Sequence, residues 1–119
     1  MTAEQIHAME AGPETDLLVR EIVEAAPPLA EPPVGFWAWD AFRPSRDWNS
    51  AMFAAERFGL FDEAERSLQL WRVGWVVCRE LPEGLRLRDR IVGCANNGPL
   101  AICRAILLLN LSRKSASSD

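Results

Sequence analysis

The chain has 119 residues, of which 49% are hydrophobic and 25% are charged, and its formal net charge is −4. This composition belongs to a single globular domain and excludes a disordered chain. No apolar run approaches the roughly 20 residues that a membrane-spanning helix needs, and the first ten residues do not resemble a secretory signal. We therefore expect a cytoplasmic protein.

The first predicted helix covers residues 15–26. Leu18 and Ile22 share one face, and Thr15 or Asp16 is a suitable N-cap. The proline pair that follows the segment ends the helix, because proline cannot continue the hydrogen-bond ladder.

Acidic residues are concentrated in the first part of the chain. Residues 1–33 contain seven acids and one base, a balance of −6, whereas residues 34–119 contain twelve bases and ten acids, a balance of +2. Such an arm is typical of a solvated helix, and the alternatives are a regulatory segment or a segment that shields the body from nucleic acid. Residues 1–12 are expected to form a flexible N-terminus.

Residues 27–44 contain five of the eight prolines, which excludes a helix interior or a central strand. The same stretch is rich in aromatic side chains, so we expect an ordered loop and not a free linker. Two interpretations stay open: the rings close the core, or they anchor a protein interface. The candidate interface residues are Phe36, Trp37, Trp39 and Phe42.

A second helix is predicted between Ser45 and Gly59. Ser45 is a suitable N-cap, Asp47 places a carboxylate in the first turn, and Gly59 suits the position just after the end. Apolar residues one helical turn apart predict the buried stripe: Trp48, Met52, Ala55 and Phe58.

Three strands follow, over residues 67–73, 75–81 and 85–95. A tight turn at Gly74 joins the first two, and the Pro-Glu-Gly sequence at 82–84 predicts a second hairpin turn. The alternation of apolar and charged residues in the third strand is typical of an antiparallel sheet with one buried face.

Arg86, Arg88 and Arg90 project from one face of the third predicted strand. Three guanidinium groups in a row form a candidate anion-binding surface for an acidic partner or a nucleic-acid backbone. The alternative is a solvated outer face on which acids of the neighbouring strand pair with the arginines.

The last helix is predicted over residues 100–111. Asn97 is a plausible N-cap, and Gly98 and Pro99 fit the first helical positions. The helix is apolar nearly all round, so it must be buried on more than one side. Residues 113–119 are polar and are expected to form a disordered tail.

The predicted fold is α+β, a layered α/β sandwich of order α-α-β-β-β-α with a three-stranded antiparallel meander, in one domain over residues 13–112. The chain resembles the phage ABA sandwich domain family. The resemblance covers roughly residues 12–112 and depends on Ser45 and Asp47, with an arginine between them in place of threonine, and on an intact Ala-Ile-Cys-Arg-Ala sequence at 101–105. It implies a layered sandwich and a phage or prophage source, and it implies no catalytic or binding residues.

Residues suited to catalysis or metal binding are scarce. His7 is the only histidine, and the three cysteines lack paired ligand spacing, so we expect no catalytic residues, no metal, no cofactor and free thiols. The helix and strand order also fits double-stranded RNA-binding domains, but these grip phosphates with lysines at the start of the last helix, and the only lysine here is Lys114.

The sequence thus favours a noncatalytic accessory protein that acts by protein–protein contact, with a host factor or with a second copy of itself as a dimer. The alternative is a nucleic-acid-binding module that uses the arginine-lined sheet face.

Overall fold

The computed structural model describes residues 2–25, 42–61, 66–72, 74–79 and 91–117. The elements are α1 (Ala3–Ala8), α2 (Pro13–Ala25), α3 (Trp48–Phe58), β1 (Arg66–Trp71), β2 (Gly74–Arg79), β3 (Ile91–Ala95) and α4 (Gly98–Ser117). The strands form one antiparallel sheet in the order β1-β2-β3. The expected α+β class and the order of two helices, three strands and a final helix are confirmed, and α1 precedes them.

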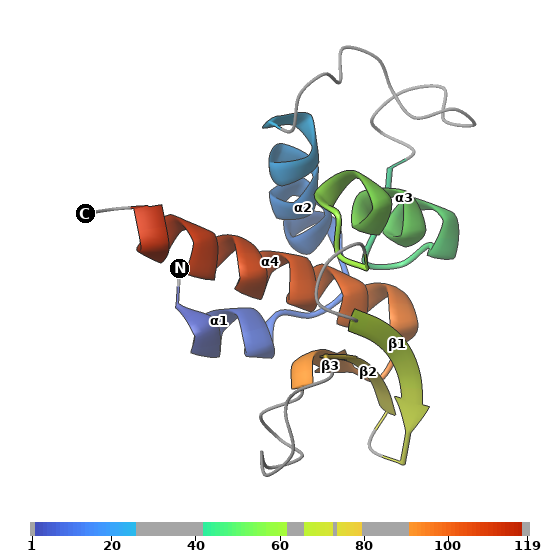
Figure 1. Cartoon of the computed structure of the whole chain (residues 1–119). Helices are drawn as coiled ribbons and strands as arrows, with labels where there is room; N and C mark the ends of the chain where they lie inside the picture. The colour runs from blue at the N-terminus through green and yellow to red at the C-terminus, as the bar shows by residue number, and fades with distance from the viewer. Residues whose placement is uncertain (1, 26–41, 62–65, 73, 80–90, 118–119) are drawn as a thin grey trace, which may run out of the picture.

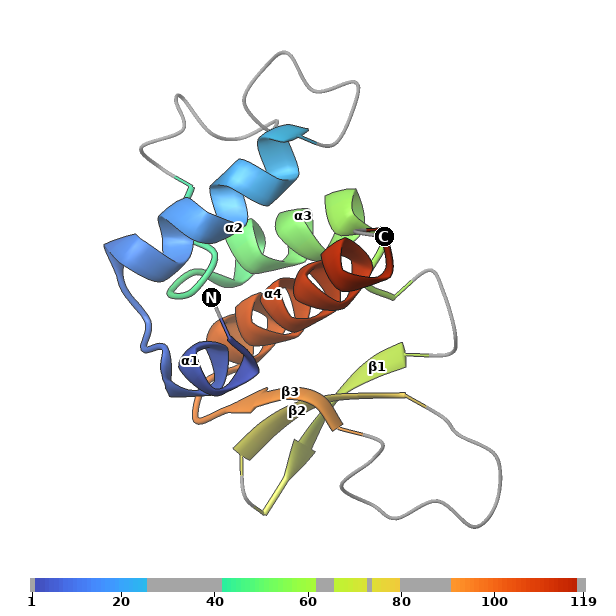
Figure 2. The ribbon, with the colours of Figure 1, turned by 90° about the vertical axis from the view of Figure 1, so that its left-hand side faces the viewer.

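Helix α4 is the centre of the fold. The sheet covers one side of it, α2 and α3 cover the other, and α1 lies alongside (Figures 1 and 2). Ile102, Ala105 and Ile106 are fully buried. The expectation that this apolar helix is buried on more than one side is confirmed.

Side chains hold α4 at its start and in its C-terminal part. At the start, the Oδ1 atom of Asn97 accepts a hydrogen bond from the backbone N–H of Leu100 at 2.6 Å, which confirms the predicted N-cap. At the end, the guanidinium of Arg113 lies 4.2 Å from the centroid of the Phe58 ring on α3. The helix continues to Ser117. The expectation of a disordered tail over 113–119 was therefore wrong for residues 113–117.

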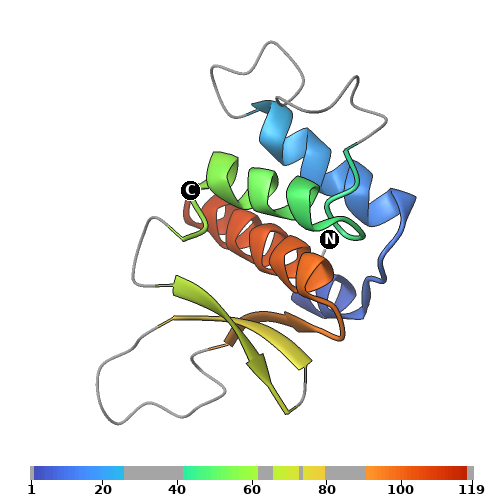
Figure 3. The same ribbon diagram turned by 90° about the vertical axis from the view of Figure 1, so that its right-hand side faces the viewer.

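Small residues let α4 approach its neighbours closely. A Cβ atom at Gly93 of β3 would lie 2.6 Å from the backbone nitrogen of Ala105. On the other side, α3 presents buried alanines 51, 54 and 55 and lies directly over α4 (Figure 3). Short side chains at these positions set the spacing of the layers.

The predicted buried stripe of α3 was only partly right. Ala55 is buried and Phe58 is half-buried, but Trp48 and Met52 are 43% and 45% exposed. The close α3–α4 contact has room for alanine and not for large rings. Trp48 instead packs its ring edge-to-face with Trp75 of β2, with 5.2 Å between the ring centroids.

The helix starts also differ from the sequence expectation. Asp47, not Ser45, caps α3: its Oδ2 atom accepts the backbone N–H of Ser50 at 2.9 Å. Thr15 and Asp16 do not cap α2 but lie buried in its first turn. Ser45 and Asp16 bind each other, which removes both from capping. Gly59 ends α3 in the left-handed conformation (φ 77°), as predicted.

The N-terminal segment is helical where a flexible arm over residues 1–12 was expected. Thr2 and Gln5 form a reciprocal capping box at the start of α1. Ile6 is only 2% exposed and belongs to the core. Arg104 of α4 supplies the physical reason, because it binds the carbonyl oxygen that follows α1.

Candidate functional site

Of the candidate site residues that the sequence suggested, Phe42 alone lies within the described part of the chain. Phe36, Trp37, Trp39, Arg86, Arg88 and Arg90 lie outside the described residues. Phe42 is 4% exposed and packs edge-to-face on Phe53, with 6.1 Å between the ring centroids. The position of Phe42 therefore fits the interpretation in which the aromatic rings of residues 27–44 close the core, and not the interpretation in which they anchor an interface.

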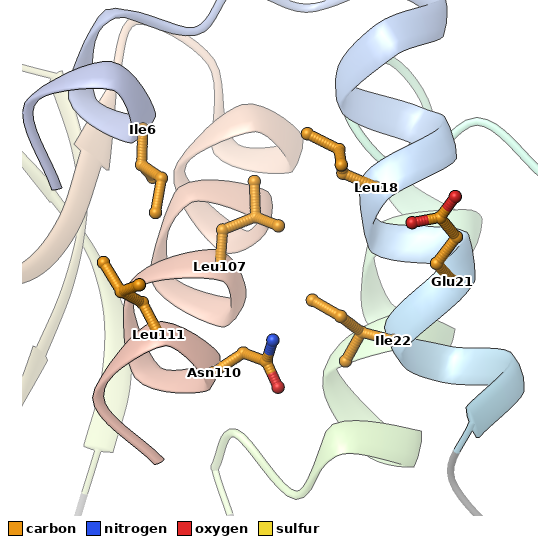
Figure 4. A pocket seen from close by; sticks show the side chains of 7 residues that line it. All are labelled: Ile6, Leu18, Glu21, Ile22, Leu107, Asn110 and Leu111. Atoms are coloured by element: carbon orange, nitrogen blue, oxygen red, sulfur yellow. The ribbon is translucent and has the colours of Figure 1, made fainter. Parts of the chain in front are cut away.

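A groove of about 200 Å³ lies between α1, α2 and α4. Leu18 and Ile22 point from α2 into the space between the helices, which Leu107 and Asn110 border on α4 (Figure 4). Five of the lining side chains are apolar and two are polar. They are Ile6, Leu18, Ile22, Leu107 and Leu111, with Glu21 and Asn110.

The α1 wall of the groove is held in place by Arg104. Its Nε atom donates to the carbonyl oxygen of Met9 at 3.0 Å, its Nη2 atom donates to the same oxygen, and its Nη1 atom donates to the carbonyl oxygen of Cys94 at 2.9 Å. One guanidinium thus joins the N-terminal segment, β3 and α4. Arg104 therefore has a structural role.

The α2 wall is anchored by a buried carboxylate. The Oδ1 atom of Asp16 accepts the backbone N–H of Ser45 at 2.7 Å and the Ser45 hydroxyl at 2.6 Å. Its Oδ2 atom accepts two hydrogen bonds from Arg46, at 3.1 Å from Nε and 2.7 Å from Nη2. These four bonds attach the first turn of α2 to the segment that leads into α3.

A second hollow adjoins the groove at Leu18, between the end of α1 and the first turns of α2. It is bordered by Met9, Leu17 and Glu14. Leu17 is 53% exposed, so its side chain is accessible at this hollow. The two hollows together form an apolar strip, which we call the α1–α2 groove.

The rim of the α1–α2 groove is acidic. Two exposed glutamates line the groove, Glu14 and Glu21, and neither has a hydrogen bond or ion pair from another described side chain. Glu24 pairs with Arg20 at 3.0 Å one turn along α2. The negative potential of this face therefore comes from residues that the fold does not neutralise.

Two described nucleophilic side chains, those of Ser45 and Cys103, are fully buried. Ser45 is fully buried and donates its hydroxyl to Asp16. Burial raises the pKa of the Cys103 thiol well above its ordinary value, and the negative charge of Asp16 adds to the rise. Within the described ranges, no three His, Cys, Asp or Glu side chains are grouped so that they could hold a metal ion.

We expect the three thiols to differ in reactivity. Cys94 is half-buried, whereas Cys78 is 7% exposed and Cys103 is fully buried and holds its proton. Because the thiolate is the reacting species, a thiol reagent at pH 8 should modify Cys94 first and Cys103 only on unfolding. Peptide mass spectrometry after timed alkylation measures this order, and early labelling of Cys103 in the folded protein would contradict the packing of α4.

The sequence indicated one part of the α1–α2 groove and missed the rest. The apolar character of the last helix indicated that several of its sides have apolar neighbours, and Leu107 and Leu111 line the groove on one of these sides. The wall from α1 was missed because residues 1–12 were expected to be flexible. The isoleucine at position 6, between polar residues, was the available signal for a buried turn.

Of the helices that the structure describes, none combines the length and the apolar character needed to cross a membrane. No known protein family, curated protein or solved structure matches the chain.

Proposed function

We propose that this chain is a noncatalytic accessory protein that binds a protein partner in the α1–α2 groove. The partner element that fits is an amphipathic helical segment with a basic polar face. One apolar side chain enters the space between Leu18, Ile22 and Leu107, and a second covers Leu17. Helix-in-groove binding of this kind uses apolar anchors three or four residues apart.

The observation that carries the proposal is an apolar strip with an unneutralised acidic rim. Apolar anchors in a concave strip provide affinity, because they remove apolar surface from water. The rim charges select the partner, since an acidic surface attracts lysine and arginine and repels a phosphate backbone. The same repulsion opposes a symmetric dimer through this face, which would bring the glutamates of two copies together.

The proposal extends to a phage or prophage origin and to action in the host cytoplasm. It is supported by the Ala-Ile-Cys-Arg-Ala sequence at 101–105, which resembles the phage ABA sandwich domain family. In the structure these residues belong to the buried part of α4, so the resemblance lies in the central helix of the fold.

A pair of synthetic peptides tests the binding mode. One carries leucine at every third or fourth position with lysine between, and the other has glutamate in place of each lysine. We expect the lysine peptide to bind and the glutamate peptide not to bind, as measured by fluorescence anisotropy at low salt. Amide chemical shifts should change in α1, α2 and α4 and not in the sheet.

Matched variants distinguish binding of the peptide in the α1–α2 groove from nonspecific binding to apolar side chains elsewhere. Leu111→Ala should weaken binding of the lysine peptide about fivefold, because it removes about 1 kcal/mol of apolar contact. Leu70→Ala should have no effect, since Leu70 is 66% exposed on β1. Glu21→Lys should weaken binding while Glu56→Lys on α3 should not. Equal binding of both peptides, or a loss that is the same in Leu111→Ala and Leu70→Ala, would rule the groove out.

A further inference from the structure

Another pocket, distinct from the two hollows of the α1–α2 groove, has a volume of about 310 Å³. It lies where the first turns of α2 meet the segment that leads into α3. Three arginines line it, Arg20, Arg43 and Arg46, together with a single carboxylate, that of Asp16. Arg20 pairs with Glu24 and Arg46 pairs with Asp16, so among the described residues the charge of Arg43 is left in excess, whereas the whole chain has a net charge of −4. This local excess of positive charge therefore needs an explanation of its own.

Asp16 cannot neutralise the whole group. Its two oxygens already accept four hydrogen bonds, two from Ser45 and two from one edge of Arg46. The side chain of Arg46 is 41% exposed, so the rest of its guanidinium faces outward. The carboxylate thus fixes the orientation of Arg46 and leaves donors of that guanidinium available.

Arg43 contributes a charge that no other described residue pairs with. Its side chain has no ion pair and no hydrogen bond with any other described residue. Its backbone is nevertheless held firmly: the N–H donates to the hydroxyl of Ser50 at 3.1 Å, and the carbonyl accepts the N–H groups of Arg46 and Asp47 at 3.0 and 2.9 Å. A fixed backbone with an unpaired guanidinium is suited to receive an anion.

Arg20 lies one helical turn after Asp16, and its Nε atom is bound to Glu24 at 3.0 Å. That ion pair uses one donor and keeps the guanidinium at the pocket. Leu17, which is 53% exposed, adds an apolar wall.

We propose that this pocket binds an oxyanion, the phosphate or carboxylate group of a small ligand. Arg43 and Arg46 would bind the anionic oxygens, because guanidinium groups recognise both kinds of oxyanion through paired N–H donors. The apolar wall at Leu17 suits a ligand whose anionic group is attached to an uncharged body. The volume is at the small end of the range for ligand pockets, which favours a small molecule. This site shares only Leu17 with the lining of the α1–α2 groove, and its anion-binding arginines do not depend on the proposed protein partner.

Titrations with inorganic phosphate and with acetate, at constant ionic strength set by chloride, test the site. The side-chain Nε–Hε signals of the arginines are followed by NMR. We expect the Arg43 and Arg46 signals to shift with a saturable curve for at least one of the two anions, and the anion that saturates identifies the group. The absence of saturation with both anions would overturn the proposal.

Two variants of equal charge change provide the control. Arg43→Gln should weaken anion binding about tenfold or more, because it removes a charge-assisted hydrogen bond. It should not change the unfolding temperature, since that side chain has no described partner. Arg72→Gln removes an exposed charge in the turn between β1 and β2 and should leave binding unchanged. Equal weakening in both variants would indicate general charge screening and would also overturn the proposal.

Discussion

Gly93→Ala is expected to lower the free energy of unfolding by about 2–3 kcal/mol, the upper part of the range for an overpacked core. The added Cβ atom would lie 2.6 Å from the backbone nitrogen of Ala105 and 3.0 Å from the carbonyl oxygen of Ala101. These are main-chain atoms in the middle of α4, which cannot rotate away as a side chain can. Either β3 or α4 must shift, and each carries part of the core. Urea unfolding followed by tryptophan fluorescence measures the loss.

Gly12→Ala is the matched control for Gly93→Ala. A Cβ atom at Gly12 meets nothing within 4 Å, and the backbone there is not in the positive-φ region. This variant should change stability by no more than about 0.5 kcal/mol, because it neither overpacks nor strains the chain. Equal stability of the two variants would show that the sheet and α4 are further apart than the structure has them.

The parts of the fold that neighbouring residues determine were predictable from the sequence. The strand meander and the last helix follow from local signals, alternation in the strands and the Asn-Gly-Pro start of α4. The bounds of the first two strands and the start of α4 were predicted within two residues, whereas α4 runs six residues past its predicted end. The predicted turn at 82–84 and residues 85–90 of the third predicted strand lie outside the described residues. Gly59 was predicted correctly because a left-handed helix end depends on that residue alone. Residues close together in the sequence determine these features, so they can be predicted from the sequence alone.

The errors arise where a distant partner decides the outcome. Ser45 has the chemistry of an N-cap, but Asp16, 29 residues earlier, takes both its hydroxyl and its backbone N–H. Trp48 and Met52 have helical spacing, but the narrow gap to α4 selects alanines for the buried side of α3. Helix α1 is too short to be stable alone, and it depends on Ile6 and on the bond from Arg104.

The α1–α2 groove combines residues from three helices that are more than 80 residues apart at the extremes. Periodicity identifies the apolar side of each helix but not which sides remain uncovered after packing. The pocket lined by Arg20, Arg43 and Arg46 could not be predicted for the same reason. Arg20 is separated from the other two arginines in the sequence by the proline-rich segment. Both sites depend on the placement of α2, and that placement depends on Asp16.

Asp16→Ala should therefore lower the free energy of unfolding by about 3 kcal/mol, since it leaves the buried N–H of Ser45 and the guanidinium of Arg46 without their acceptor. Asp16→Asn should cost less, because an amide oxygen can still accept from Ser45. Chemical denaturation of both variants measures the two losses.

A double-mutant cycle with Arg46→Ala separates the ion pair from the serine bonds. If the pair contributes, Asp16→Ala should cost about 1 kcal/mol less in the Arg46→Ala background than alone, because the coupled bonds are already absent. Equal costs in both backgrounds would assign the whole effect to Ser45. In either case α2 loses its attachment to the segment before α3. Amide exchange in α2 should then accelerate more than in α4, whose own contacts with the sheet and α3 remain.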